Sequence, residues 1–388
     1  MKITPKRLAT GSQKNIVTGS AQQNWPGLAY KANAREVVER LSALYERRAA
    51  DRIFAKLSVR HERETLLDFR KTHSVGPCEY PDPAERIDFW DCALKERPQV
   101  EDDALPSVYL WEMDMGLWGG IFGAQPVFTC NADNGQISSN AEPALRDWSE
   151  FERLHFDRAN PWFQKYLRQL QVFAAGAHGK FGVCPICMLN GFHCSWELVG
   201  PTAAYMGLVD QPDMIRRAME FGFEVCTAVM DAYFENVPLF CGGTCDLFCE
   251  WLPGRTVMES VDGFSLTSVA YFEEWGRAAL ERIFSRYDGG EVHIHGNGRH
   301  QLEAVSSVKG LKAIYLGDDK GFPEAFSVLD ELKARAGDVP LIVDASISEF
   351  TEKLEKHELP GNVLYKVGGF ESVSAANRCM EKVKAYRI

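Results

Sequence analysis

The chain has 388 residues, 45% of them hydrophobic, and is long enough to bury a substantial core. Its formal net charge of −11 argues against an extended basic surface, and so against nucleic acid as a partner. There is no uncharged apolar run of eighteen residues and no apolar signal-peptide core near the start, so we expect a soluble cytoplasmic protein with no membrane partner. The eleven cysteines are an odd number, and in that compartment we expect free thiols or metal ligands.

The first fifty residues are predicted to form an N-terminal arm and a helix. Residues 1–32 are polar and show no sustained period, which favours an arm on the surface of this subunit or on a partner subunit in a homodimer. A helix is expected from Asn33, where Glu36 three residues later suggests a capping box and an apolar stripe follows.

Residues 51–388 alternate short β-rich runs with longer helical patterns and are predicted to form one catalytic domain. The eight predicted strands are 52–59, 107–113, 181–187, 239–245, 291–296, 313–318, 340–345 and 363–369. The main predicted helices are 212–235, 268–287, 299–309, 322–336, 346–357 (opened by Ser346 and Glu349) and 371–386.

Repeated βα units require parallel strands joined by right-handed crossovers. The sequence therefore predicts an α/β fold, a (β/α)8 TIM barrel with an N-terminal helical extension and early insertions at 61–106 and 114–160. An open doubly wound sheet is the competing fold, but no glycine-rich fingerprint follows the first predicted strand.

Two histidines near a predicted strand end are the leading candidates for a functional site. Catalytic groups of such barrels lie at the carboxyl ends of the strands. His293 and His295 stand two positions apart, so their imidazoles point to the same face and can converge on a metal or an anionic substrate. The alternative is that one packs in the core and the other lines the mouth passively. A zinc site needs at least a third ligand, which must come from elsewhere.

Carboxylates at other strand ends are further candidates. In "WEMDMGLWGG" the aromatic neighbours of Glu112 can raise its pKa and make it a proton donor, although solvation or pairing with arginine is the alternative. In "LGDDKG", Asp318 is expected to face the mouth, while the second carboxylate caps the next helix. We expect catalytic roles for His293, His295, Asp318 and Glu112, and substrate-binding roles for Trp111, Asp114, Asp246, Glu250 and Asn297.

The cysteine clusters are weak signals of a metal site. "CPIC" at 184–187 has no second pair at zinc-knuckle spacing, and most of these thiols are expected to be buried as small apolar side chains. Cys245, or its neighbour Cys249, is an exception, because this segment follows a predicted strand end and could reach the two histidines; Cys245 is the expected third metal ligand.

From about residue 45 to its end, the chain resembles the uroporphyrinogen decarboxylase superfamily, which includes methyltransferases that act on corrinoid proteins or methyl donors. The segments that carry the resemblance are "AADRIFAKLSV", "WELVGPTAAYMGLVDQPDMIRRAMEF", "SLTSVAYFEEWGRAALERIF" and above all "VHIHGNG", which stands where the methyltransferases have His-x-Cys-Gly. We find no match to the Arg-x-x-x-Arg-type motif of the decarboxylase itself. The resemblance therefore implies a member other than the true porphyrinogen decarboxylase.

In the zinc methyltransferases of that superfamily, the metal is held by this His and Cys and by a later Cys near the last strand. The resemblance gives His293 as the first ligand, has His295 in place of the second, and places Gly368 about where the late Cys would be. It thus implies a zinc or other divalent-metal site that needs another ligand, such as Cys245, Glu112 or Glu250.

The resemblance favours a metal-dependent methyltransferase or demethylase that acts on a small methylated compound, with a corrinoid protein as methyl-transfer partner. The alternative is a metal-free decarboxylase or lyase of a small carboxylic acid, in which the histidines bind the carboxylate and Asp318 or Glu112 handles the proton. A binding protein without turnover is also compatible with the sequence.

Overall fold

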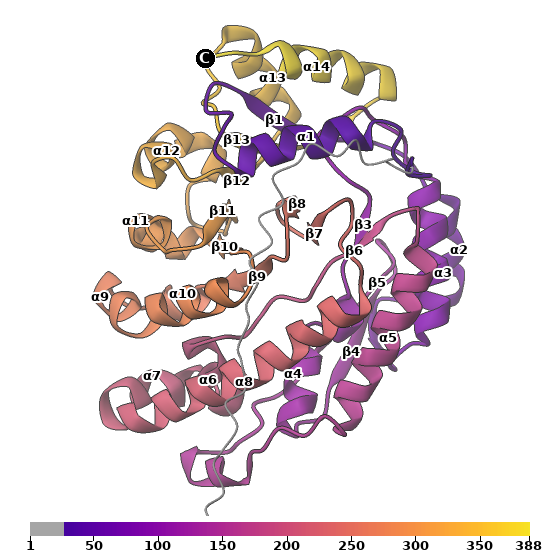
Figure 1. Ribbon diagram of the computed structural model, residues 1–388. Coiled ribbons are helices and arrows are strands. Elements are labelled where there is room, and N and C mark those ends of the chain that lie inside the picture. Colours follow the sequence, from indigo (N-terminus) through magenta and orange to yellow (C-terminus); the bar gives the residue numbers. More distant parts are fainter. Residues whose placement is uncertain (1–26) are drawn as a thin grey trace, which may run out of the picture.

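Six parallel strands form the central sheet of the computed structural model, which describes residues 27–388 (Figure 1). Their order across the sheet is β1-β13-β12-β11-β10-β9. Their bounds are β1 (Ile53–Val59), β9 (Val257–Ser260), β10 (Gly290–Ile294), β11 (Leu311–Leu316), β12 (Leu341–Ala345) and β13 (Val363–Phe370). The predicted α/β fold with a parallel sheet is confirmed.

Helices link the later strands, as parallel pairing demands. They are α9 (Val269–Tyr271), η4 (Phe272–Gly276) and α10 (Arg277–Arg286) before β10; η5 (Gly296–Gln301) and α11 (Leu302–Ser306) after it; η6 (Ala325–Val328) and α12 (Leu329–Ala336) after β11; α13 (Ile347–Lys356) after β12; and α14 (Val373–Ala385) after β13. In Figure 1 they lie around the outside of the strands. The strands are rich in Val, Ile and Leu and largely buried, as expected for a sheet covered by helices.

The first two-thirds of the chain supplies the other elements. Its helices are α1 (Ala34–Tyr45), α2 (Glu64–Thr72), α3 (Pro83–Lys95), η1 (Trp111–Met113), α4 (Asp114–Phe122), η2 (Trp148–Arg153), α5 (Pro161–Ala177), α6 (Phe192–Val199), α7 (Pro201–Asp210), α8 (Pro212–Asn236) and η3 (Asp262–Phe264). Its strands are β2 (Gly76–Cys78), β4 (Val127–Asn131) and β5 (Gln136–Asn140) in an antiparallel sheet, the parallel pair β3 (Ser107–Val108) and β6 (Gly182–Val183), and the antiparallel hairpin β7 (Gly243–Asp246) and β8 (Glu250–Pro253). No helix within residues 27–388 is both long and apolar enough to cross a bilayer.

The two predicted capping boxes differ in the structure. Ser346 caps α13 by accepting a hydrogen bond from the backbone N–H of Glu349, and its hydroxyl also bonds to the Glu349 carboxylate. The side chain of Asn33 makes no such bond to the start of α1, although the helix begins where it was predicted. Residues 1–26 of the predicted N-terminal arm lie outside the described residues.

The closed eight-stranded barrel is not confirmed. Among the described residues, strand pairing leaves β3 and β6 apart from the six-stranded sheet, and the predicted strand 239–245 contributes to a hairpin instead. The hairpin forms because the Asp246 carboxylate accepts bonds from the backbone N–H groups of Phe248 and Cys249, which turns the chain back on itself. The strand beside β10 is β9, which the sequence analysis missed because it is only four residues long.

The edge of β1 that does not face β13 is bonded by two aspartates rather than by a regular strand. Asp102 accepts a bond from the backbone N–H of Leu57, and Asp103 accepts one from that of Ala55. Lys31 and Arg40 pair with these two buried carboxylates. Side-chain bonds thus satisfy backbone groups of β1 that a neighbouring strand would otherwise satisfy.

Candidate metal centre

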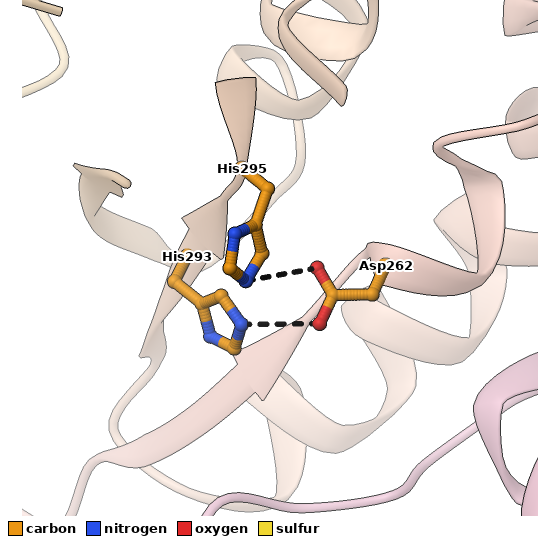
Figure 2. A group of neighbouring side chains, drawn as sticks. All are labelled: Asp262, His293 and His295. Atoms are coloured by element: carbon orange, nitrogen blue, oxygen red, sulfur yellow. Dashed lines mark hydrogen bonds and ion pairs between the residues drawn. The ribbon is translucent and has the colours of Figure 1, made fainter. Parts of the chain in front are cut away.

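His293 and His295 point to one side of β10 and face a carboxylate from the segment that follows the neighbouring strand (Figure 2). His293 lies within β10, and His295 follows its end and precedes η5. Nε2 of His293 is 3.3 Å from Oδ2 of Asp262, and Nε2 of His295 is 3.9 Å from Oδ1 of the same residue. The predicted convergence of the two imidazoles is therefore present, and Asp262 is the group on which they converge.

Asp262 reaches this position because it follows β9, which pairs with β10 in parallel. One ligand atom from each of Asp262, His293 and His295 can be chosen so that all three lie within 4.8 Å of one another. Within residues 27–388, no other three histidine, cysteine or acidic side chains are grouped closely enough to hold a metal ion. The sequence analysis missed Asp262 because it missed β9; a carboxylate two residues after that strand was the available signal.

The electrostatics of Asp262 depend on His293. Burial by itself raises the pKa of the Asp262 carboxyl, but the hydrogen bond and positive charge of His293 outweigh it and hold this pKa well below its usual range. Asp262 is therefore an anion at neutral pH. Its Oδ1 is buried and has no hydrogen-bond partner among the described residues, so a lone pair remains available to a ligand.

Asp319 holds the second histidine from the other side. Its Oδ1 lies 3.0 Å from Nδ1 of His295, and its Oδ2 accepts a bond from the backbone N–H of Asn297. Burial opposes ionisation, but these bonds lower the pKa of Asp319 overall. A carboxylate bonded to the outer nitrogen of an imidazole is the common support of a metal-binding histidine.

These groups fit a divalent metal by their chemistry. Two imidazoles and one carboxylate are ligands of catalytic zinc sites, and three protein ligands leave a position for water or substrate. The same donor set also suits other divalent metals, such as iron. The unpartnered Oδ1 of Asp262 and the orientation of His295 by Asp319 agree with such a role.

Three further titratable groups lie around the histidines. Asp114 accepts a bond from the hydroxyl of Tyr109, and burial raises its pKa to about 6, against the effects of that bond and of the His293 charge. Burial and the charge of Asp114 raise the pKa of Glu197 to about 7. Burial lowers the pKa of His193 to about 4, although the charge of Asp262 opposes it. Carboxyl groups that titrate near neutral pH can donate and accept protons.

Several residues predicted to act in the site are used elsewhere. Glu112 is buried and bonds to Arg86 at 2.6 Å and to Gln169 at 3.0 Å, which is the arginine-paired alternative. Glu250 pairs with Lys56 at 2.6 Å. Neither carboxylate belongs to the group formed by the histidines.

Cys245 and Asp318 also lie outside that group. Cys245 is buried against Gly182 on β6, where a Cβ on that glycine would lie 2.1 Å from the sulfur. Asp318 accepts bonds from Arg299 and from the backbone N–H of Ala325, so the neighbour of Asp319 secures the next segment instead. The sequence analysis expected Asp318 to face the site and its neighbour to bond to the next helical segment. In the structure Asp319 faces His295, and Asp318 bonds to the next segment. All eleven cysteines are free thiols.

The other predicted substrate-binding residues make the following contacts in the structure. Asn297 contacts Asp319 through its backbone, and Asp246 bonds to the turn of the β7–β8 hairpin. Trp111 packs edge-on against Tyr109 at a centroid distance of 4.7 Å. Trp111 and Asp246 both line a cavity of about 290 Å³.

Comparison with solved structures bears on the fold. The fold is similar to that of a methyltransferase. The structure described as a methyltransferase from Methanosarcina mazei superposes with a TM-score of 0.55 at 14% sequence identity, over 90% of this chain and 98% of that one. Neither a protein-family model nor a curated protein matches the sequence. Membership of the uroporphyrinogen decarboxylase superfamily stays a prediction.

Proposed function

We propose that this protein is a metal-dependent methyltransferase or demethylase that acts on a small methylated compound. The observation that carries the proposal is the grouping of Asp262, His293 and His295, whose ligand atoms lie within 4.8 Å of one another. The similarity of the fold to a methyltransferase supports it. We also propose that the strands form an irregular barrel, since a backbone bond from Met188 to Met258 links the segment after β6 to β9.

We propose separate roles for the metal ligands, for the residue that orients one of them and for a proton donor. Asp262, His293 and His295 would hold a zinc ion or another divalent metal, which supplies Lewis acidity toward the heteroatom of the methyl donor. Asp319 fixes the ring of His295. Asp114, whose pKa of about 6 lets it carry a proton, would protonate the heteroatom.

The proposed methyl acceptor is a Co(I) corrinoid on a partner protein. The methyl group would leave its heteroatom without the bonding electrons, which stay on the heteroatom and are neutralised by the proton. The corrinoid would supply the electron pair of the new bond to the methyl carbon. The test is to incubate the protein with methyl ethers, thioethers and methylamines and with cob(I)alamin, and to measure methylcobalamin.

We expect at least one class of methyl donor to give methylcobalamin, and we expect His293→Ala to abolish its formation. An exposed substitution such as Arg146→Gln should leave the rate unchanged, since that side chain is 89% exposed. Methyl transfer that survives the combined replacement of His293 and His295 would contradict the proposal.

A second candidate is a metal-free decarboxylase or lyase of a small acid. The contact between His293 and Asp262 favours it, because a carboxylate beside an imidazole is also the arrangement of an acid–base pair. Release of CO2 from an acid by protein treated with a chelator would identify this reaction.

A further inference from the structure

A second polar region lies near the histidines. A cavity of about 290 Å³ is lined by side chains from β1, α3, β3 and the β7–β8 hairpin. Arg63 follows β1 and Trp111 follows β3, so they stand at the carboxyl ends of their strands. His295 stands at the same end of β10, which lies in the same parallel sheet as β1. The cavity and the candidate metal centre therefore open at one end of the fold.

Two guanidinium groups in this cavity form no ion pair with any described residue. Arg63 and Arg97 both line it, and neither forms an ion pair within the part of the chain that the structure describes. Burial lowers the pKa of Arg63 and the positive charge of Arg97 lowers it further, while the negative charge of Glu96 opposes both effects. Two like charges placed together at a half-buried site favour the binding of an anion.

The carboxylates nearby are already engaged. Glu250 pairs with Lys56, and Glu96 accepts bonds from the backbone and hydroxyl of Thr65. The Asp246 carboxylate accepts two backbone bonds within its hairpin. These carboxylates keep their negative charge, and that of Glu96 acts on Arg63, but none of them forms an ion pair with Arg63 or Arg97 among the described residues.

The rest of the cavity wall is largely aromatic. Trp90, Tyr109 and Trp111 line it, and the rings of Tyr109 and Trp111 meet edge to face. Such rings bind a flat apolar body, and a guanidinium fork binds a planar carboxylate through two parallel bonds. The volume is at the lower limit of about 300–1,000 Å³ for ligand pockets, which suits a small ligand.

We propose that this cavity binds a small aromatic carboxylate, with the carboxylate on Arg63 and Arg97 and the ring between Trp90, Tyr109 and Trp111. Binding of this ligand does not require the proposed function. Only the identification of the ligand as the substrate rests on that function. Tyr109 connects the two regions, because it lines the cavity and its hydroxyl donates to Asp114. The ring of Phe248, in the hairpin beside the cavity, lies 4.9 Å from that of His293.

The test is calorimetric binding of 4-methoxybenzoate to the purified full chain, with 4-methoxybenzyl alcohol as the uncharged analogue and inorganic phosphate as the free anion. We expect saturable binding of the acid, and at least about tenfold weaker binding of the alcohol, because the charge-assisted bonds are lost. Phosphate should also bind more weakly, since it has no ring for the aromatic wall.

Arg63→Gln and Arg97→Gln should each weaken binding of the acid about tenfold to a hundredfold, while the exposed control Arg146→Gln leaves it unchanged. Circular dichroism shows whether each variant folds, and the corresponding lysine variants, which keep the charge, should recover part of the affinity. Equal affinity for acid and alcohol, for acid and phosphate, or for wild type and both glutamine variants would overturn the inference. Metal content is measured in the same samples, so a protein that binds the acid but no metal would refute the metal-dependent function and leave this site standing.

Discussion

Nδ1 of His295 lies 3.0 Å from Oδ1 of Asp319, while Nε2 of the same ring faces Asp262. The bond to Asp319 keeps the imidazole proton on Nδ1 and leaves the lone pair of Nε2 directed at the candidate metal centre. The adjacent carboxylate, Asp318, makes a different set of bonds. Replacing Asp319 and replacing Asp318 should therefore have different effects.

Replacing Asp319 with alanine should weaken metal binding. The ring of His295 loses its support, so we expect a metal affinity about tenfold to a hundredfold lower, as for other such supporting groups. Competition with a chromophoric chelator at neutral pH measures this affinity. An affinity equal to that of the wild type would show that Asp319 does not orient a ligand.

Replacing Asp318 with alanine should destabilise the fold without changing metal affinity. Its carboxylate accepts bonds from Arg299 and from the backbone of Ala325, and the largely buried guanidinium of Arg299 would lose one partner. We expect a loss of about 1–3 kcal/mol in the free energy of unfolding, measured with urea. If this variant lost the metal and the Asp319 variant kept it, the assignment of the two residues would be reversed.

Glu197 should make stability depend on pH. Its pKa rises from 4.5 to about 7 on folding, because it is buried and lies near Asp114. The folded chain thus binds this proton more tightly than the unfolded chain, so stability falls as pH rises from about 4.5 to 7. The neutral variant Glu197→Gln should be more stable than the wild type at pH 8, and this advantage should shrink toward pH 4.5.

Urea unfolding of the metal-free protein at several pH values measures this difference. The exposed substitution Glu371→Gln is the matched control and should show no such trend. A constant difference between wild type and Glu197→Gln across that range would be inconsistent with a raised pKa.

The bonds at the edge of β1 should contribute strongly to stability. Asp103→Ala would leave the backbone N–H of Ala55 and the charge of Arg40 without their partner, which typically costs about 3–5 kcal/mol for a buried ion pair. Asp338→Ala breaks the exposed pair with Arg47 and should cost only about 0–1 kcal/mol. Equal losses in the two variants would mean that Asp103 does not replace strand pairing at this edge.

The sequence predicts the later half of the fold well because local and long-range signals agree there. Each strand from β10 to β13 is a short β-rich run followed by a helical pattern, and the cap at Ser346 forms as its residues indicate. The earlier half departs from this rule. The Asp246 carboxylate turns an apolar segment into a hairpin, and β9 is only four residues long.

The alternation of side chains along a single strand was enough to predict the two histidines of the candidate site, but not its carboxylates. His293 and His295 share a face because they are two residues apart on β10, whereas Asp262 joins them through the pairing of β9 with β10. Which of Asp318 and Asp319 faces the histidines depends on how the chain leaves β11, and no local pattern encodes this.

The most direct test of the account is the metal content of the purified protein after removal of metal and reloading with zinc. We expect about one zinc ion per chain for the wild type, and a large loss for Asp262→Ala, for His293→Ala and for His295→Ala. Asp114→Asn, which lies outside the proposed ligand group, should retain the metal. Less than about half an equivalent of metal in the wild type, or full loading of the Asp262 variant, would contradict the central claim.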